Sequence, residues 1–343
     1  MIHSYFLPMT GLIMLGSLTE EYLSKREWKK PLLTVVSFCA TAFCLLFVLG
    51  AFYQDASPIG EGLGTFGANL NTFFNPLSYS SLFQGLPLYY DFQYEGFAYL
   101  GAGILAMGLL AAGLTASAFI RKKEHRLELT YLGVVAVFIL LATLPIVALN
   151  DKKLFGVPYP QLLSTLLNIF RSNGRFIWGA MYMLMLGIIA VCVKYIRQQT
   201  LLKIVVAVCL LLQLADLSKT VSEKRNYFAK EEHVYKPLWD QEAVNAVIDE
   251  YGQFIFMYDE NDIIMDTAYY AYFHGMKQNS YYYARSYEEQ IAAGILEYAE
   301  QLRTGDVKKN AIYIFRKEDM RDISCEKLYF YSMGDHVIGS AAP

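Results

Sequence analysis

The sequence predicts an α-helical polytopic membrane protein with about six transmembrane helices, followed by a C-terminal soluble α/β domain. Three observations support this fold class. Hydrophobic residues make up 55% of the 343 residues and charged residues only 18%, and the apolar residues lie in long runs. Basic residues cluster in every second connection between these runs. After residue 216 the pattern changes to short helix-like and strand-like segments.

The apolar runs are expected to cross the membrane as helices, because about 20 residues are needed to span about 30 Å of hydrocarbon. Pro145 lies inside the fourth run and is expected to kink it, since proline removes one backbone hydrogen bond. No charged residue lies at mid-depth in any run, which argues against an ion pump or an ion-coupled transporter. The expected spans are 1–18, 32–53, 97–119, 129–149, 176–196 and 201–217.

The basic clusters predict the orientation of these spans. They lie in the connections 25–30, 121–126 and 194–203, whereas the long segment 54–96 contains no Lys or Arg. Short loops rich in Lys and Arg stay in the cytoplasm. The sequence therefore predicts a multi-pass protein of the cell membrane, with the loop 54–96 and the domain 217–343 outside the cell.

The C-terminal domain differs from the membrane region in charge and in pattern. Residues 1–216 hold 15 Lys/Arg and 11 Asp/Glu, whereas residues 217–343 hold 14 and 21. An acidic domain is a poor partner for nucleic acid, which binds through basic residues on its phosphates. No glycine-rich phosphate loop follows a predicted strand, so the sequence does not indicate nucleotide binding.

Strands and helices are expected to alternate in this domain, which favours an α/β layer with a partly parallel sheet. The expected strands are 253–258, 280–283, 311–315 and 328–332, and the expected helices are 237–251, 263–274 and 287–302. The predicted core consists of aliphatic and aromatic residues in these segments. It comprises Phe254, Ile255, Phe256, Ile291, Ile295, Ile312 and Ile314.

The sequence contains no residue spacing that is typical of a metal site, a cofactor site or a disulfide framework. Four of the five cysteines lie in apolar runs, where free Cys acts as a small hydrophobic residue, and Cys325 is alone in the C-terminal domain. The five histidines show no ligand spacing. We expect no metal, no cofactor and no disulfide.

The long outer loop 54–96 is the first candidate for a functional segment, because long loops without evident structure are usually functional or disordered. Its many Phe and Tyr residues suit either a membrane interface or the apolar faces of sugar rings. Asn69, Asn71, Asp91 and Glu95 are its candidate substrate-groove residues. The alternatives are an interfacial segment and ordinary solvated carboxylates.

The second candidate is the segment 170–176, at the outer start of the fifth span. Arg171 and Arg175 are four residues apart and would share one face of a helix. Guanidinium groups beside the exposed N–H groups of a helix start favour phosphate binding. The sequence therefore predicts a lipid-phosphate site at these two arginines. General anchoring to membrane lipid head groups is the alternative.

Three strings carry a resemblance to a known family: "GTFGANLNTFFNP" (Gly64–Pro76), "YEGFAYLGAGIL" (Tyr94–Leu105) and "FRSNGRFIW" (Phe170–Trp178). With the overall layout, they resemble the C-terminal half of uncharacterised polytopic bacterial membrane proteins that look like GT-C class glycosyltransferases. The resemblance implies an envelope enzyme that uses a polyprenyl-phosphate-linked sugar.

In the GT-C class the catalytic acidic residue lies in the first outer loop, in a half that this chain would lack. The resemblance therefore carries over no catalytic residue, and whether the chain is an enzyme stays open. The alternatives are a non-catalytic scaffold, whose outer domain binds envelope polysaccharide or a membrane partner protein, and a flippase-like protein that handles a lipid carrier.

Overall fold

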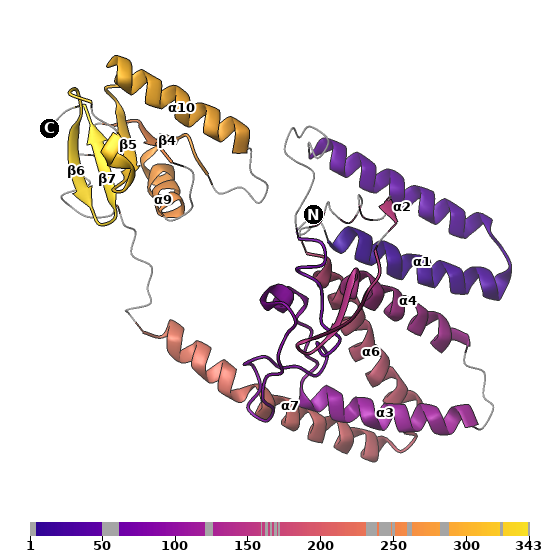
Figure 1. Ribbon diagram of the computed structural model, residues 1–343. Helices are drawn as coiled ribbons and strands as arrows, with labels where there is room; N and C mark the ends of the chain where they lie inside the picture. Colours follow the sequence, from indigo (N-terminus) through magenta and orange to yellow (C-terminus); the bar gives the residue numbers. More distant parts are fainter. Residues whose placement is uncertain are drawn as a thin grey trace. The chain divides into compact units, whose positions relative to one another are not determined.

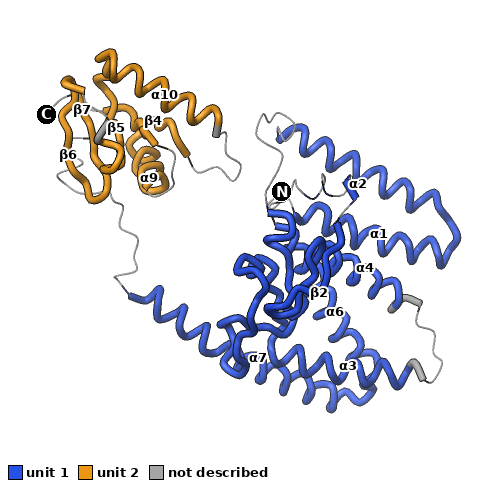
Figure 2. The backbone as a smooth tube through the Cα atoms, viewed as in Figure 1, with its two compact units in different colours: residues 1–54, 58–230 blue, residues 55–57, 231–343 orange. Residues whose placement is uncertain are grey.

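The structure of the chain is a computed structural model. The residues that it describes are 5–49, 62–120, 126–158, 160–161, 164, 167, 170, 172–230, 239, 248, 251–258, 263–281, 288–322 and 325–341. They form two compact units (Figure 2): residues 1–54 with 58–230, and residues 55–57 with 231–343. The first unit is mainly helical and the second contains a five-stranded sheet.

The first unit is built from long helices joined by one large loop and a small hairpin (Figure 1). The 3-10 helix η1 lies in the large loop, and η2 leads directly into α6. The elements are α1 (Phe6–Lys25), α2 (Lys29–Val48), η1 (Asp91–Gly96), α3 (Ala102–Ile120), α4 (Arg126–Thr143), β1 (Ile146–Leu149), β2 (Lys152–Gly156), η2 (Asn173–Phe176), α6 (Ile177–Tyr195) and α7 (Gln199–Phe228).

Among the described residues, three helical stretches are long enough and apolar enough to cross a membrane, rather than the six expected. They are Lys29–Val48, Asn173–Tyr195 and Gln199–Phe228, and two shorter apolar helices cover Ala102–Ala118 and Leu129–Thr143. No residue of α2 is buried. An apolar helix left so exposed by its own protein is typical of a helix surrounded by lipid. The expected span 1–18 falls in α1, whose last two turns carry Glu20, Glu21 and Lys25.

The expected kink at Pro145 is wrong, because the helix ends there instead. Helix α4 stops at Thr143, and β1 begins at Ile146 and pairs antiparallel with β2. Proline has no N–H to donate, and it pushes the preceding residue out of the helical region. The span 129–149 was expected to be helical throughout. In the structure its last four residues form the first strand of a hairpin instead.

The helices of the first unit pack through small residues. Helix α3 lies against α6 and α7, and α4 lies against α6 and α1. A Cβ atom at Gly179 would lie 2.6 Å from the ring of Phe138, and one at Gly103 would lie 2.1 Å from the carbonyl oxygen of Cys209. Glycine at these two positions lets the helix axes approach closely.

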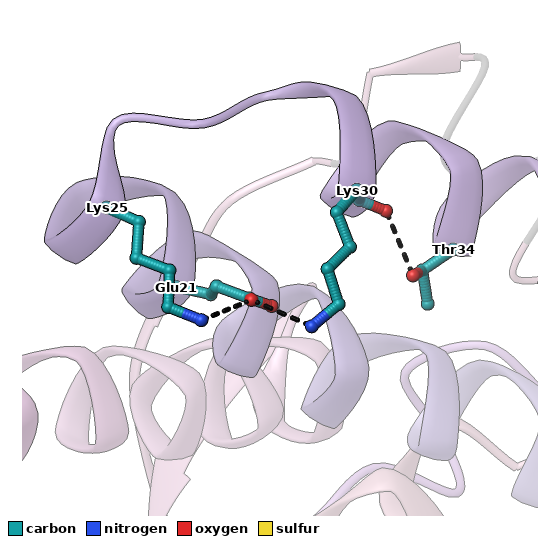
Figure 3. A network of polar contacts seen from close by, with 4 residues as sticks. All are labelled: Glu21, Lys25, Lys30 and Thr34. Atoms are coloured by element: carbon teal, nitrogen blue, oxygen red, sulfur yellow. Dashed lines mark hydrogen bonds and ion pairs between the residues drawn. The ribbon is translucent and has the colours of Figure 1, made fainter.

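A cluster of charged side chains joins the end of α1 to the start of α2 (Figure 3). The Nζ atoms of Lys25 and Lys30 donate to the same Oε1 of Glu21, at 3.0 and 3.2 Å. These hydrogen bonds, from Lys25 first, hold the pKa of Glu21 below its ordinary value. Both lysines are exposed, so the cluster orients the turn more than it stabilises the fold.

Helix α7 passes the expected domain boundary at residue 217 and ends at Phe228. The sequence changes from apolar to polar after Asp216, but Ser, Lys, Glu and Arg continue a helix without strain. The second compact unit begins at residue 231, apart from residues 55–57. The change of hydropathy therefore marks a change of environment along one helix rather than the end of that helix.

The second unit contains a mixed sheet in the order β4-β3-β5-β7-β6. Strand β3 is parallel to β4 and β5, whereas β7 is antiparallel to β5 and β6. The partly parallel α/β layer is therefore confirmed. Its elements are β3 (Gln253–Phe256), α9 (Ile264–His274), β4 (Lys277–Gln278), α10 (Glu288–Thr304), β5 (Ala311–Arg316), η4 (Asp319–Asp322), β6 (Tyr329–Met333) and β7 (His336–Ser340).

The sheet has an apolar cluster on each face. Alternate residues of β5 enter different clusters, Ile312 and Ile314 with residues of α9, and Tyr313 with Leu302 of α10. Phe254, Ile255 and Phe256 are also buried, so five of the seven predicted core residues are confirmed. The other two, Ile291 and Ile295 of α10, are half-buried.

One expected segment differs from the structure, one lies mostly outside the described residues, and one strand was not expected. The short strand β4 lies at 277–278, before the expected strand 280–283, whose last two residues lie outside the described residues. Most of the expected helix 237–251 also lies outside them. Strand β7, which was not predicted, pairs antiparallel with both β5 and β6.

We predict that Gly103→Ala lowers the thermal stability of the protein in detergent, because the added Cβ would meet the backbone of α7. Overpacking of this kind costs about 1–3 kcal/mol. Gly113→Ala in the same helix is the matched control, since nothing lies within 4 Å of a Cβ built there. It should stabilise slightly through helix propensity. Equal melting temperatures for the two variants would contradict the close approach of α3 and α7.

Candidate functional site

Two of the residues singled out from the sequence, Glu95 and Arg175, meet in the structure. Glu95 lies in η1 and Arg175 in η2, and these two short helices contact each other. Arg175 Nη2 and Nε lie 2.6 and 2.7 Å from the same carboxylate oxygen, Oε2 of Glu95. Eighty residues apart in the sequence, the two form a charge-assisted pair of the stronger kind.

The pair is only partly open to solvent. The Arg175 side chain is 25% exposed and the Glu95 side chain 12%. The guanidinium carbon of Arg175 lies 5.4 Å from the ring centre of Tyr5 and 6.0 Å from that of Trp178, within the range of cation–π attraction. A small polar surface is therefore framed by aromatic rings at the start of an apolar helix.

Hydrogen bonds to backbone carbonyl oxygens hold the three residues before Arg175 in place. The N–H of Gly174 donates to the carbonyl oxygen of Phe66 at 2.9 Å, and the Ser172 hydroxyl donates to the same oxygen at 3.0 Å. A Cβ atom at Gly174 would lie 2.4 Å from that oxygen, so only glycine allows this approach. Asn173 Nδ2 donates to the carbonyl oxygens of Leu141, Ala142 and Leu144, where α4 ends.

Glu95 is held by the packing of η1 on the large loop. Thr72 donates its hydroxyl proton to the carbonyl oxygen of Gly96 at 2.5 Å, and Trp178 Nε1 donates to that of Phe97 at 3.1 Å. A Cβ atom at Gly96 would lie 2.6 Å from Cα of Ala68. Contacts with the loop and with α6 thus fix the position of the two residues that follow Glu95.

Three other predicted site residues, Asn69, Asn71 and Asp91, are described by the structure and form no hydrogen bond or ion pair with either member of this pair. Asn69 and Asn71 are buried, at 1% and 0% exposure. Asn69 Nδ2 donates to Gln93 Oε1 and to the carbonyl oxygen of Asn150, both at 2.9 Å. Asp91 is exposed at the start of η1, and Arg171 lies outside the described residues. The structure thus gives the two asparagines a supporting position inside the loop.

These amides belong to a larger set of buried polar side chains that takes the place of regular secondary structure in the loop. Asn75 Oδ1 accepts from the N–H groups of Leu77 and Leu86, at 3.0 and 2.9 Å. Asn71 Nδ2 donates to the carbonyl oxygen of Pro87 at 3.1 Å. Buried backbone groups need such partners, because unpaired ones are costly.

A buried carboxylate that sequence reasoning missed lies on α7. Asp216 is fully buried, and its Oδ2 accepts from the Tyr99 hydroxyl at 2.8 Å and from the Ala102 N–H at 2.9 Å. Its Oδ1 accepts from the Ser80 hydroxyl. One turn before it, Gln213 Oε1 accepts from the N–H of Gly103 at 2.9 Å.

Asp216 and Gln213 therefore cap the first turn of α3 from a neighbouring helix. A helix start leaves four N–H groups without a partner in the helix, and an acidic group suits the positive end of its dipole. The sequence placed Asp216 at the end of a span. Its position in the middle of the longer α7 is the signal for its role, since a charged residue inside such a helix needs a partner.

His, Cys, Asp and Glu side chains are the groups of this protein that could hold a metal ion. Within the ranges described, no three His, Cys, Asp or Glu side chains gather as ligands. All five cysteines are free thiols. The arrangement at Glu95 and Arg175 offers ionic and hydrogen-bonding recognition beside aromatic rings.

We predict that Asp216→Asn lowers the stability of the protein by about 1–3 kcal/mol, the cost of leaving a buried polar group unpaired. The carboxylate accepts three hydrogen bonds, whereas an amide would place its own N–H groups against one of these donors. Glu223→Gln, at an exposed position of the same helix, is the control and should change little. Thermal unfolding in detergent measures both variants. A wild-type melting temperature for Asp216→Asn would rule out the cap as a stabilising contact.

Comparisons with known proteins place the chain in a family without giving it an activity. Residues 1–218 match a family described as a domain of unknown function (DUF6311), and residues 243–340 match the DUF6311 C-terminal domain. No curated protein and no solved structure matches the chain. The first match alone covers more than half of the 343 residues. The chain therefore belongs to the DUF6311 family.

Proposed function

We propose that the chain is the C-terminal portion of a GT-C-like membrane glycosyltransferase for cell-envelope glycans, and that it binds the head group of a lipid-linked sugar at the Glu95–Arg175 pair. The observation that carries the proposal is the pair itself. A largely buried guanidinium, paired with a carboxylate and close to two aromatic rings, matches the chemistry of a sugar phosphate. The resemblance to the GT-C class supplies the reaction type.

The position of the pair at the start of an apolar helix supports a lipid-linked ligand. Arg175 is the third residue of the apolar stretch Asn173–Tyr195. A phosphate bound there would lie at the membrane surface, while its polyprenyl tail runs along α6 in the lipid. Tyr5 and Trp178 have the amphipathic rings that are common at this level of a bilayer.

Glu95 affects phosphate binding, because its carboxylate already forms an ion pair with the Arg175 guanidinium. An anionic head group must either displace the carboxylate or bind beside it against its repulsion. Sugar hydroxyls, in contrast, can donate to Glu95 and accept from Arg175 together. The pair therefore favours a ligand that carries both a phosphate and a sugar.

The same proposal includes the membrane topology. We place further crossings at α1, α3 and α4, so that six helices cross the bilayer with the basic connections in the cytoplasm. The positive-inside rule supports this arrangement. The second unit is then extracytoplasmic, on the side where the lipid-linked sugar and the Glu95–Arg175 pair lie.

A second candidate function is a non-catalytic scaffold whose outer domain binds envelope polysaccharide. The observation that favours it is an exposed face of α9, where residues three or four positions apart carry large side chains. Tyr272 is 81% exposed and Phe273 65%, beside exposed Met265 and Tyr269. Exposed aromatic rings suit the apolar faces of sugars.

We predict opposite effects for the two members of the pair on binding of a short-chain polyprenyl phosphate in nanodiscs. Arg175→Ala should weaken binding by about ten- to a hundredfold, since a hydrogen bond to a charged group contributes about 1.5–3 kcal/mol and 1.4 kcal/mol corresponds to a factor of ten. Glu95→Gln should tighten binding, because it removes the competing carboxylate.

Arg197→Ala is the control for this experiment, since Arg197 is an exposed arginine in the connection after α6. It should bind like wild type. Phosphate-free polyprenol serves as the ligand control and should not respond to either change at the pair. Equal affinity of wild type, Arg175→Ala and Glu95→Gln for the phosphate would reject the head-group site.

We predict that a cysteine introduced as Ser222→Cys reacts with a membrane-impermeant thiol reagent added to intact cells, whereas one introduced as Lys122→Cys does not. Ser222 lies in the exposed polar part of α7, beyond Asp216. The unchanged protein measures the background of the native cysteines. Labelling of Lys122→Cys with protection of Ser222→Cys would reverse the orientation.

A further inference from the structure

Residues of the large loop of the first unit line a small, partly open cavity that the proposed function does not use. It has a volume of about 10 Å³ and lies between the start of the loop and η1. Five of its eight lining residues carry an amide or hydroxyl group, and the other three are Leu77, Leu88 and Phe97. The polar lining residues are Asn69, Asn71, Thr72, Asn75 and Gln93.

Two polar atoms of this lining have no hydrogen-bond partner within the described part of the chain. They are the amide oxygen Oδ1 of Asn71 and the amide nitrogen Nε2 of Gln93. The two residues are buried, at 0% and 2% exposure. Buried polar groups without a partner are rare in native proteins, and each one calls for a physical reason.

The other half of each amide fixes its orientation. Asn71 Nδ2 donates to Asn150 Oδ1 at 2.9 Å and to the carbonyl oxygen of Pro87 at 3.1 Å. Gln93 Oε1 accepts from Asn69 Nδ2 at 2.9 Å and from the Tyr89 N–H at 3.1 Å. Turning either amide around would set oxygen against oxygen or N–H against N–H. One unpaired acceptor and one unpaired donor therefore belong to two residues that line the same cavity.

The combination of one unpaired acceptor and one unpaired donor determines which class of ligand fits. A cation would need several free oxygens, but Asn69 Oδ1 already accepts from Asn71 N and Asn150 N, and Asn75 Oδ1 from two other N–H groups. The N–H of Gln93 would also repel it. An anion would be repelled by the free oxygen of Asn71. A neutral hydroxyl both donates and accepts, and the volume holds about one water molecule.

We propose that this cavity is a binding site for one structural water molecule, which accepts from Gln93 Nε2 and donates to Asn71 Oδ1. The water joins the start of the loop to η1, two residues before Glu95. It completes the amide network on which the position of Glu95 depends. The proposal stands on the cavity and its polar atoms alone, and so it is independent of the ligand of the Glu95–Arg175 pair.

A cryo-electron microscopy map of the chain in nanodiscs, at a resolution that shows ordered water, tests the site directly. We expect one density peak within hydrogen-bonding distance of both Asn71 Oδ1 and Gln93 Nε2. An empty cavity, or a direct hydrogen bond between the two side chains, would overturn the proposal. A peak with several oxygen neighbours at metal-coordination distances would replace it with a cation site.

A longer apolar side chain at the cavity wall gives a second test. The sign of the change in melting temperature decides it. Leu88→Met at the wall should displace the water and leave both polar atoms unpaired, which lowers the melting temperature by about 2–4 °C. Leu82→Met, at an exposed position of the same loop, should change it little. A rise in melting temperature for Leu88→Met alone would mean that the cavity is dry, because filling a dry cavity stabilises a protein.

Discussion

The capping of α3 by side chains of α7 is the contact on which the first unit depends. The N–H groups of Ala102 and Gly103 are the free donors of a helix start, and in an apolar environment a free donor costs several kcal/mol. Asp216 and Gln213 accept from them. Because the acceptors come from another helix, α3 is complete only when it lies against α7. The same carboxylate binds Ser80 and Tyr99, so the cap also positions the end of the large loop.

The large loop shows how a long chain segment can be ordered without strands or long helices. Its buried amides replace the hydrogen bonds that a sheet would supply: Asn75 binds Leu77 and Leu86, and Asn69 binds Asn150 in the turn between β1 and β2. Buried polar networks of this kind are stabilising only when nearly every group is paired. The order of the loop is therefore cooperative, and η1 with Glu95 depends on amides that lie far from it in the sequence.

These two sets of contacts converge on the Glu95–Arg175 pair. Glu95 lies in the large loop, and Arg175 lies in η2, which leads into α6. Close contacts at Gly96 and Gly174 hold both segments in position. An ion pair that is partly buried gains little stability over apolar packing. Its placement beside Tyr5 and Trp178, at the start of an apolar helix, is more readily understood as a recognition surface. In this member of the DUF6311 family, we propose that this surface recognises a lipid-linked sugar.

Composition and periodicity determined the broad architecture of this protein: a helical region with apolar helices, and a C-terminal α/β unit whose buried strands were evident from runs such as 253–258 and 311–315. These signals are local, because a helix or a buried strand shows its environment in consecutive side chains. The residues Glu95 and Arg175 were also found from the sequence, each for its own chemistry. Tertiary structure alone decided that they form a pair, that Asn69 and Asn71 lie inside the loop, that Pro145 ends α4, and that α7 continues past Asp216. Each of these features depends on a partner that is distant in the chain or on where a series of backbone hydrogen bonds ends. The spacing of neighbouring residues in the sequence does not reveal either one.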